Sequence, residues 1–466
     1  MTDIFILPLI HFYAVCRRWI MSSKKQILMN TALLTLSSLM LRMAGMIFQA
    51  WVASRIGAEG VGLYQLTGSV TVLFHVLAVS GIRFASTKLI SEESVVTGGN
   101  VLGAVRCCTI YAILFGALSC SALMLLSQSL AFLWIGDARV VRSLRIAAYA
   151  APFTALSAVF SGYFTSFGRI WKMVLAQLFS TGACAAITVF LLLHTNSLDL
   201  EMTCASITVG NVISEGLGFF ILFLFYLHER SHRPLTHQKS SNLTHRMLSA
   251  ALPLAFSSYT RTGLSTLEHM MIPKGLRLSG LTAEAALSGY GIVHGMALPA
   301  VLFPACLLFS LAELIVPELT RSKARNQPKR ILHIIHVCRI GTLIYASATA
   351  ATLYLLADFI AARIFHTPEC AAVIRALAPL VPIMNLDTIT DGCLRGLGKQ
   401  SCVMAINILD AALGVLLVLL LLPRSGVNGY IQMIRITETA NCLLSFCALQ
   451  HTLRKNKAPG QWPKAL

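Results

Sequence analysis

The sequence predicts an all-α polytopic membrane protein with about twelve transmembrane helices. Only 12% of the 466 residues are charged, against about 25% in soluble globular proteins. The mean hydropathy is +0.73, and the apolar stretches reach the roughly 20 residues that a helix needs to span a membrane. Together these observations exclude a water-soluble globular protein.

Twelve apolar stretches joined by short loops account for most of the chain. Gly and Pro are spread through them, which suits membrane helices, because neighbouring helices re-satisfy interrupted backbone hydrogen bonds. No loop exceeds about twenty residues, so we expect no soluble catalytic domain and no enzymatic activity. The expected helices lie near residues 27–53, 61–84, 102–127, 143–166, 171–193, 204–227, 245–271, 286–312, 332–356, 372–394, 402–422 and 427–450.

The net charge of +18 indicates topology. With the N-terminus inside, 22 Lys and Arg fall in segments predicted to be cytoplasmic, and seven fall on the opposite side. Cytoplasmic loops of membrane proteins carry such an excess, so both termini are expected in the cytoplasm. Anionic headgroups of the cytoplasmic membrane are the expected partners of these charges, and nucleic acid is not expected as a partner.

Neither a cofactor nor a metal is expected. The thirteen Cys include no CxxC pair, and most lie inside expected helices, where Cys acts as a small apolar residue. The four His of the sixth connection (His228, His232, His237 and His245) have no regular spacing and suit a solvated loop. Residues 1–23 form an N-terminal extension to which we assign no function.

The two halves of the chain share a pattern that predicts an internal repeat. A shift of 230 residues places Pro152 on Pro382, Gly162 on Gly392, Gly168 on Gly398 and Arg169 on Lys399. Chance recurrence of short glycine motifs is the competing explanation. A duplication predicts an N-lobe of helices 1–6 at 24–228, a linker at 229–246, a C-lobe of helices 7–12 at 247–451 and a basic tail at 452–466. Parallel repeats of this kind are related by an axis along the membrane normal.

Several motifs resemble those of the stage V sporulation protein B group of polysaccharide and lipid flippases, over about residues 24–450. The first half carries Arg55-Ile-Gly-Ala-Glu-Gly-Val-Gly-Leu-Tyr-Gln65, the run Ser80-Gly-Ile to Lys88-Leu-Ile-Ser-Glu92, and Gly162-Tyr-Phe-Thr-Ser-Phe-Gly168. The second half carries Tyr290-Gly-Ile-Val-His-Gly-Met-Ala-Leu-Pro299, Phe303-Pro304 and Leu314-Ile-Val-Pro317.

This resemblance implies the multidrug and toxin extrusion type of fold, with two six-helix lobes in a V around a central cavity and alternating access. It also implies a lipid-linked, anionic sugar precursor as substrate, and cell-wall synthesis proteins as partners of a monomeric transporter. Family members often have Pro where this chain has Arg83, and Arg where this chain has Gln49 and Ser161. Some members have fourteen helices.

Charged residues inside the first helix of each half are the candidate substrate site. A charge at the bilayer centre costs about 2.5–3.5 kcal/mol, so such residues usually face a partner or a wet cavity. The guanidinium of Arg binds phosphate oxygens bidentately, which suits a pyrophosphate. The alternative is that each Arg pairs with an internal carboxylate such as Glu268, Asp387, Asp391 or Asp410. The two predicted polar stripes are Ser38, Arg42, Gly45 and Gln49 in helix 1, and Ser257, Arg261, Ser265 and Glu268 in helix 7.

Three further sets of residues are weaker candidates. Arg83 and Lys88 lie near the cytoplasmic end of helix 2, where a portal role competes with snorkelling to headgroups. Asp387, Asp391 and Arg395 follow one helix face, so an Asp391–Arg395 pair would leave Asp387 freer to carry a coupling proton or cation. His75, His269 and His294 are expected to be packed, hydrogen-bonded imidazoles rather than proton relays.

Two other functions remain open at this point. A drug antiporter of the same fold would export organic cations against protons or sodium, and its site would favour exposed carboxylates and aromatic rings over Arg. The third possible function is that of a non-transporting scaffold or a membrane enzyme of wall assembly. The sequence contains no catalytic constellation for an enzyme, and internal charges would be a needless cost for a scaffold.

The charge asymmetry makes a direct prediction about topology. Reporter proteins fused after Arg246, after Arg330 and at the C-terminus should all report a cytoplasmic location, because the basic segments are retained inside. The measurement is the activity of paired cytoplasmic and external reporters at each site. An external signal at any one of the three sites would break the twelve-helix topology and the repeat that depends on it.

Overall fold

The computed structural model describes residues 23–95, 100–194, 199–232 and 242–455. These residues form helices joined by short turns, with no strand in the described ranges. Within the same ranges, nine segments are long and apolar enough to cross a membrane. The all-helical membrane fold predicted from composition is therefore confirmed.

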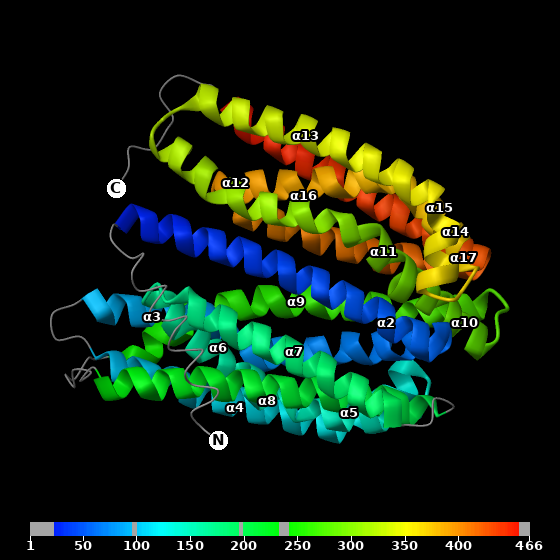
Figure 1. Ribbon diagram of the computed structural model, residues 1–466, viewed down its shortest axis with the longest axis horizontal. Coiled ribbons are helices and arrows are strands. Elements are labelled where there is room, and N and C mark those ends of the chain that lie inside the picture. The colour runs from blue at the N-terminus through cyan, green and yellow to red at the C-terminus, as the bar shows by residue number, and fades with distance from the viewer. Residues whose placement is uncertain (1–22, 96–99, 195–198, 233–241, 456–466) are drawn as a thin grey trace.

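Two single helices in these segments are far too long for one crossing. The helices α2 (Ser23–Val79) and α17 (Gln400–Lys455) have 57 and 56 residues, or about 85 Å of helix, against a hydrocarbon core of about 30 Å. Each contains one residue with non-helical dihedrals, Gly57 at φ 71° and Gly426 at φ 55°. Figure 1 shows α2 running toward α10 and then returning. The expected total of twelve crossings stays a prediction, since α9 is not among the nine segments.

Seven of the described α-helices, α2 included, lie in the first half of the chain. The Ser80-Gly81 pair separates α2 from the next helix, because both residues have positive φ, 46° and 73°. A π-helical segment, Leu130–Ile135, follows α4. The remaining helices of this half are α3 (Ile82–Val95), α4 (Val101–Ser129), α5 (Val140–Ala148), α6 (Ala150–Ser166), α7 (Ile170–His194) and α8 (Leu200–His232).

The second half begins with α9 and ends with α17. Two π-helical segments, Gly291–Ala297 and Ile360–Ile364, and two 3₁₀ turns, Phe303–Ala305 and Ala378–Leu380, interrupt its helices. The α-helices before α17 are α9 (Leu243–Leu278), α10 (Ala283–Tyr290), α11 (Leu298–Leu302), α12 (Cys306–Ala324), α13 (Pro328–Leu355), α14 (Ala357–Phe359), α15 (Cys370–Leu377) and α16 (Val381–Gly396).

Features of the two halves recur at the shift of 230 residues that the sequence predicts. The π-helical segments begin at Leu130 and Ile360, and the helices α5 and α15 begin at Val140 and Cys370. The turns after α6 and α16 both place a glycine in the left-handed region, Gly168 at φ 67° and Gly398 at φ 76°. The sequence match is thus accompanied by a match in backbone geometry, which favours duplication over chance recurrence of glycine motifs.

The apolar cores show where the halves join. The largest core draws on both halves, with buried residues from α2, α4, α5, α10, α15 and α17. The other two cores are separate: one belongs to α3, α4, α6 and α8, and one to α12, α13, α16 and α17. The halves therefore share one core at one end and diverge at the other, where α2 and α13 begin (Figure 1).

Helix α9 belongs to the second half by sequence but begins against the first half. Met247 and Ala251 are buried in the core of α3, α4, α6 and α8. Arg246 forms ion pairs of 2.6 Å with Glu92 and Glu93 of α3. Further along, α9 packs against α17, so it bridges the halves. The predicted lobe boundary at residue 247 remains a prediction.

Three glycines allow the halves to touch at the backbone where they join. We call Gly62, Gly291 and Gly295 the glycine seam. The second part of α2 here crosses α10 and the π-helical segment that follows α10. A Cβ would lie 2.3 Å from the Leu287 oxygen at Gly62, 2.0 Å from the Ala58 oxygen at Gly291, and 2.0 Å from the Val61 Cγ1 at Gly295. A side chain at the first two positions would force two backbones apart.

The seam predicts a position-specific loss of stability. Gly62→Ala and Gly291→Ala should each lower the free energy of unfolding by about 1–3 kcal/mol, the usual cost of overpacking. Gly68→Ala is the matched control, because Gly68 lies on α2 with no atom within 4 Å of its Cβ position. Unfolding of the purified protein in detergent would measure the difference. Equal stability of Gly291→Ala and Gly68→Ala would contradict the seam.

Candidate functional site

Four carboxylates from three helices gather inside the second half. We call them the acidic cluster: Glu268 of α9, Asp387 of α16, and Asp410 and Glu438 of α17. Glu268 interacts electrostatically with Asp410, and Glu438 interacts with the other three. The carboxylate of Glu268 lies against Gly414, where an added Cβ would be 2.8 Å from its oxygen. Gly414 therefore makes room for the contact between α9 and α17.

Within this cluster, Asp387 has an unsatisfied oxygen. Its side chain is only 9% exposed, and its Oδ2 accepts a hydrogen bond of 3.0 Å from Asn441 Nδ2. The Oδ1 atom has no hydrogen-bond partner among the described residues. A buried carboxylate in this state has a strong tendency to take up a proton or a cation.

The neighbouring Asp391 is held by two partners. It forms the intrahelical ion pair with Arg395 that the sequence predicts, at 3.5 Å. It also accepts a hydrogen bond of 3.4 Å from Ser445 Oγ. Asp387 is accordingly the less compensated of the two carboxylates, as the i+4 spacing suggests, although Asn441 partly satisfies it.

The face of α9 that carries Arg261 looks away from the first half. Tyr259 and Thr266 donate hydrogen bonds to the first half, to the oxygens of Leu77 at 3.5 Å and Ser69 at 3.2 Å. Glu268 contacts α17 instead. Arg261 precedes Glu268 by seven residues, so it shares the face of Glu268, about 10 Å nearer the divergent end.

Arg261 is exposed at this position and forms no ion pair with a described carboxylate. The predicted alternative, that it pairs with an internal acid and only fixes packing, is not what the described residues show. Ser265 and Gln49 are half-buried. The side chains of Ser38 and Arg42 lie outside the described part of the structure, so their predicted roles stay predictions.

The two portal candidates lie on α3. Arg83 and Lys88 are both exposed. Arg83 interacts electrostatically with Glu215 of α8, whose carboxylate accepts a hydrogen bond of 3.3 Å from Thr154 of α6. The sequence analysis did not single out Glu215. The sequence feature that could have identified Glu215 is a single carboxylate in the middle of an apolar stretch.

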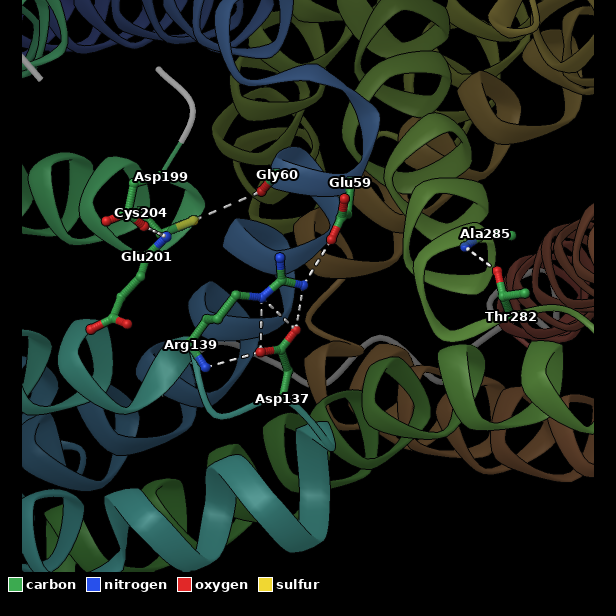
Figure 2. Close-up of polar contacts among 9 residues, drawn as sticks. All are labelled: Glu59, Gly60, Asp137, Arg139, Asp199, Glu201, Cys204, Thr282 and Ala285. Carbon is green, nitrogen blue, oxygen red and sulfur yellow. Dashed lines mark hydrogen bonds and ion pairs between the residues drawn. The ribbon is translucent and has the colours of Figure 1, made fainter. Parts of the chain in front are cut away.

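The glycine motif around Glu59 forms the turn between the two parts of α2. Figure 2 shows Arg139 between Asp137 and Glu59, with 2.7 Å from its Nη2 to each carboxylate. Hydrogen bonding to Asp137, and then to Glu59, raises the pKa of Arg139. Gly57 supplies the positive φ of the turn, and Gly62 lies in the seam. The motif thus places α2 against α10.

No group of three or more His, Cys, Asp and Glu side chains in the described ranges has the arrangement of a metal site. The acidic cluster is a set of carboxylates that interact electrostatically with one another. The arrangement combines an exposed guanidinium on the face of α9 that is turned away from the first half with a buried carboxylate, Asp387, whose Oδ1 has no partner among the described residues.

The chain matches known proteins in both sequence and fold. A family described as "Polysaccharide biosynthesis protein" matches residues 27–323. Stage V sporulation protein B of Bacillus subtilis (strain 168) is 21% identical over 423 residues, covering 87% of this chain and 80% of the relative. Sporulation protein YkvU of the same organism is 22% identical over 350 residues, covering 74% and 77%.

The fold is that of a solved transporter. A multidrug resistance transporter of the MATE family and MOP superfamily, in its inward-facing conformation, superposes with a TM-score of 0.72 at 11% identity. The match covers 91% of this chain and 99% of that one. The multidrug and toxin extrusion type of fold that the resemblance implies is therefore confirmed, and the chain has the fold of a membrane transporter.

Proposed function

Since the chain belongs to the polysaccharide biosynthesis protein family, we propose that it flips a lipid-linked anionic oligosaccharide or peptidoglycan precursor across the bacterial cytoplasmic membrane. The headgroup would pass between the two halves while the lipid tail stays in the bilayer. Alternating access would close the divergent end of the V and open the end at the glycine seam. No covalent chemistry is involved.

The observation that carries this proposal is Arg261. An Arg inside a membrane helix costs several kcal/mol unless it is paired or wet, and Arg261 is exposed and pairs with no described carboxylate. A water-filled space between the halves would account for both properties. In that space the planar guanidinium is suited to grip two phosphate oxygens at once. Arg42, on the first helix of the other half, is proposed as its counterpart, with Ser38, Gln49 and Ser265 beside them.

We assign the coupling ion to Asp387, with Asp391 as its neighbour. Four carboxylates close together cannot all stay ionised in a buried site, because like charges repel there. Uptake and release of an ion at Asp387 would change the balance of charge between α16, α17 and α9. Since α9 also carries Arg261, such a change is mechanically connected to the substrate site.

The cytoplasmic surface is proposed to bind anionic headgroups. Arg321, Arg325, Lys329 and Arg330 are exposed around the turn between α12 and α13, in the run where the charge asymmetry is greatest. Arg83 and Lys88 would guide a charged headgroup from this surface toward the space between the halves. Both termini are proposed to lie on this side, and cell-wall synthesis proteins would supply or receive the substrate.

A cation exporter of the same fold is the rival function, and the charge of the site separates the two. Lys keeps the positive charge of Arg but lacks the bidentate fork, so Arg261→Lys and Arg42→Lys should be intermediate between wild type and Ala. The Ala variants should lose roughly 1.5–3 kcal/mol of binding, about ten- to a hundredfold in affinity. The Glu variants should be worse than Ala, because a carboxylate repels pyrophosphate.

The measurement is translocation of a fluorescent lipid-pyrophosphate sugar in vesicles with matched amounts of protein. Arg363→Ala is the control, since Arg363 is an exposed Arg of the π-helical segment Ile360–Ile364 and has no role in the proposed binding. Ala variants with full activity would remove the main support for an anionic substrate. Glu variants as active as the wild type would refute the proposed flippase function for an anionic substrate.

A further inference from the structure

Four aromatic side chains form a polar group inside the shared apolar core. We call them the His–Tyr cluster: His269 of α9, Tyr290 of α10, His294 of the π-helical segment and Tyr430 of α17. Tyr290 Oη and His269 Nδ1 are hydrogen-bonded at 3.2 Å. The rings of His269 and His294 are 4.4 Å apart, and Tyr290 stacks on both His294 at 5.3 Å and Tyr430 at 6.3 Å. The four rings are thus in continuous contact.

The cluster lies between the acidic cluster and the seam. On one side, His269 is the chain neighbour of Glu268, and both tyrosines interact electrostatically with Glu268. On the other side, His294 is flanked by Gly291 and Gly295, two members of the seam. His294 is eleven residues from the start of α10 at the joined end, or roughly 15 Å of helix.

The elements that pack against the His–Tyr cluster carry charged and polar groups. Glu268 interacts electrostatically with both tyrosines, and Glu438 interacts with Glu268. From α2, Ser69 forms a hydrogen bond with Tyr290. The helix α15 also packs against the π-helical segment. Its Arg375 forms an ion pair with Asp358. Two imidazoles 4.4 Å apart cannot both be cationic at low cost.

His294 also occupies a segment with unusual backbone geometry. Short π-helical stretches occur frequently at functional sites, and this one replaces an α-helical turn at the level of the seam. Neutral His and Tyr side chains each donate and accept hydrogen bonds, so the hydrogen-bonded pair of Tyr290 and His269 can pass a proton along, and His294 lies in ring contact with both. A purely structural core would use apolar rings here without the cost of burying polar atoms.

We propose that His294, His269 and Tyr290 form a proton path that connects the joined end of the molecule with the acidic cluster. When that end opens, one imidazole takes up a proton from water and passes it through the hydrogen-bonded pair to Glu268. The imidazolium loses one N–H proton, the carboxylate becomes a carboxylic acid, and no other bond changes. The inference rests on the proposed function and identifies its coupling ion as the proton.

The test uses the full-length protein in vesicles that contain a pH-sensitive dye and a lipid-pyrophosphate sugar. His269→Gln and His294→Gln should each reduce substrate-dependent proton movement by roughly tenfold or more, the usual contribution of a positioned acid–base group. Tyr290→Phe keeps the ring and its stacking but removes the hydroxyl, so it should also slow proton movement. His75→Gln is the matched control, because His75 is an imidazole of α2 whose buried Nε2 has no partner among the described residues.

The outcomes separate this inference from the proposed function. Loss of proton movement in the three cluster variants, with substrate binding kept and His75→Gln unaffected, would support the path. Wild-type proton movement in all three variants would overturn it, as would lipid translocation by the wild type that needs sodium and moves no protons. Either of these two contradicting results would leave the proposed flippase function intact. Absence of lipid translocation in the wild type would refute the proposed function and the coupling with it.

Discussion

The fold depends on the close backbone contact between α2 and the helix that begins at α10. Gly62 and Gly291 let two helices from different halves approach until an added Cβ would lie about 2 Å from a carbonyl oxygen. This contact lies in the core that both halves share. Apart from the start of α9, which packs with the first half, the other two cores contain residues of one half each, so the halves are joined at one end and diverge at the other.

Helix α9 connects this architecture to the site. Its first turns are bound to α3 by Arg246 and buried with the first half, while its later turns meet α17 through Glu268. Arg261 lies between these two regions, on the face directed to the second half. Its exposure is a consequence of where the halves part. A movement of the second half relative to α9 would therefore change the surroundings of Arg261 and of the acidic cluster together.

Much of the fold could be predicted from the sequence, because composition and apolar length alone identify a helical membrane protein. The repeat was also visible: Gly168 and Gly398 match in sequence and both adopt positive φ. The Asp391–Arg395 pair followed from i+4 spacing on one helix. Contacts between helices distant in the sequence were less accessible. His269 and His294 were expected to be packed imidazoles, and their mutual contact depends on how α9 meets the π-helical segment. Glu215 and Glu438 acquire partners only through tertiary packing.

Substrate charge is the central claim of this account, and transport by the wild-type protein tests it most directly. The purified protein would be placed in vesicles, and translocation of a fluorescent lipid-pyrophosphate sugar would be compared with efflux of a cationic dye under the same proton gradient. The account predicts translocation of the lipid and no gradient-driven efflux of the dye. Dye efflux without lipid translocation would contradict it and make the chain a cation exporter.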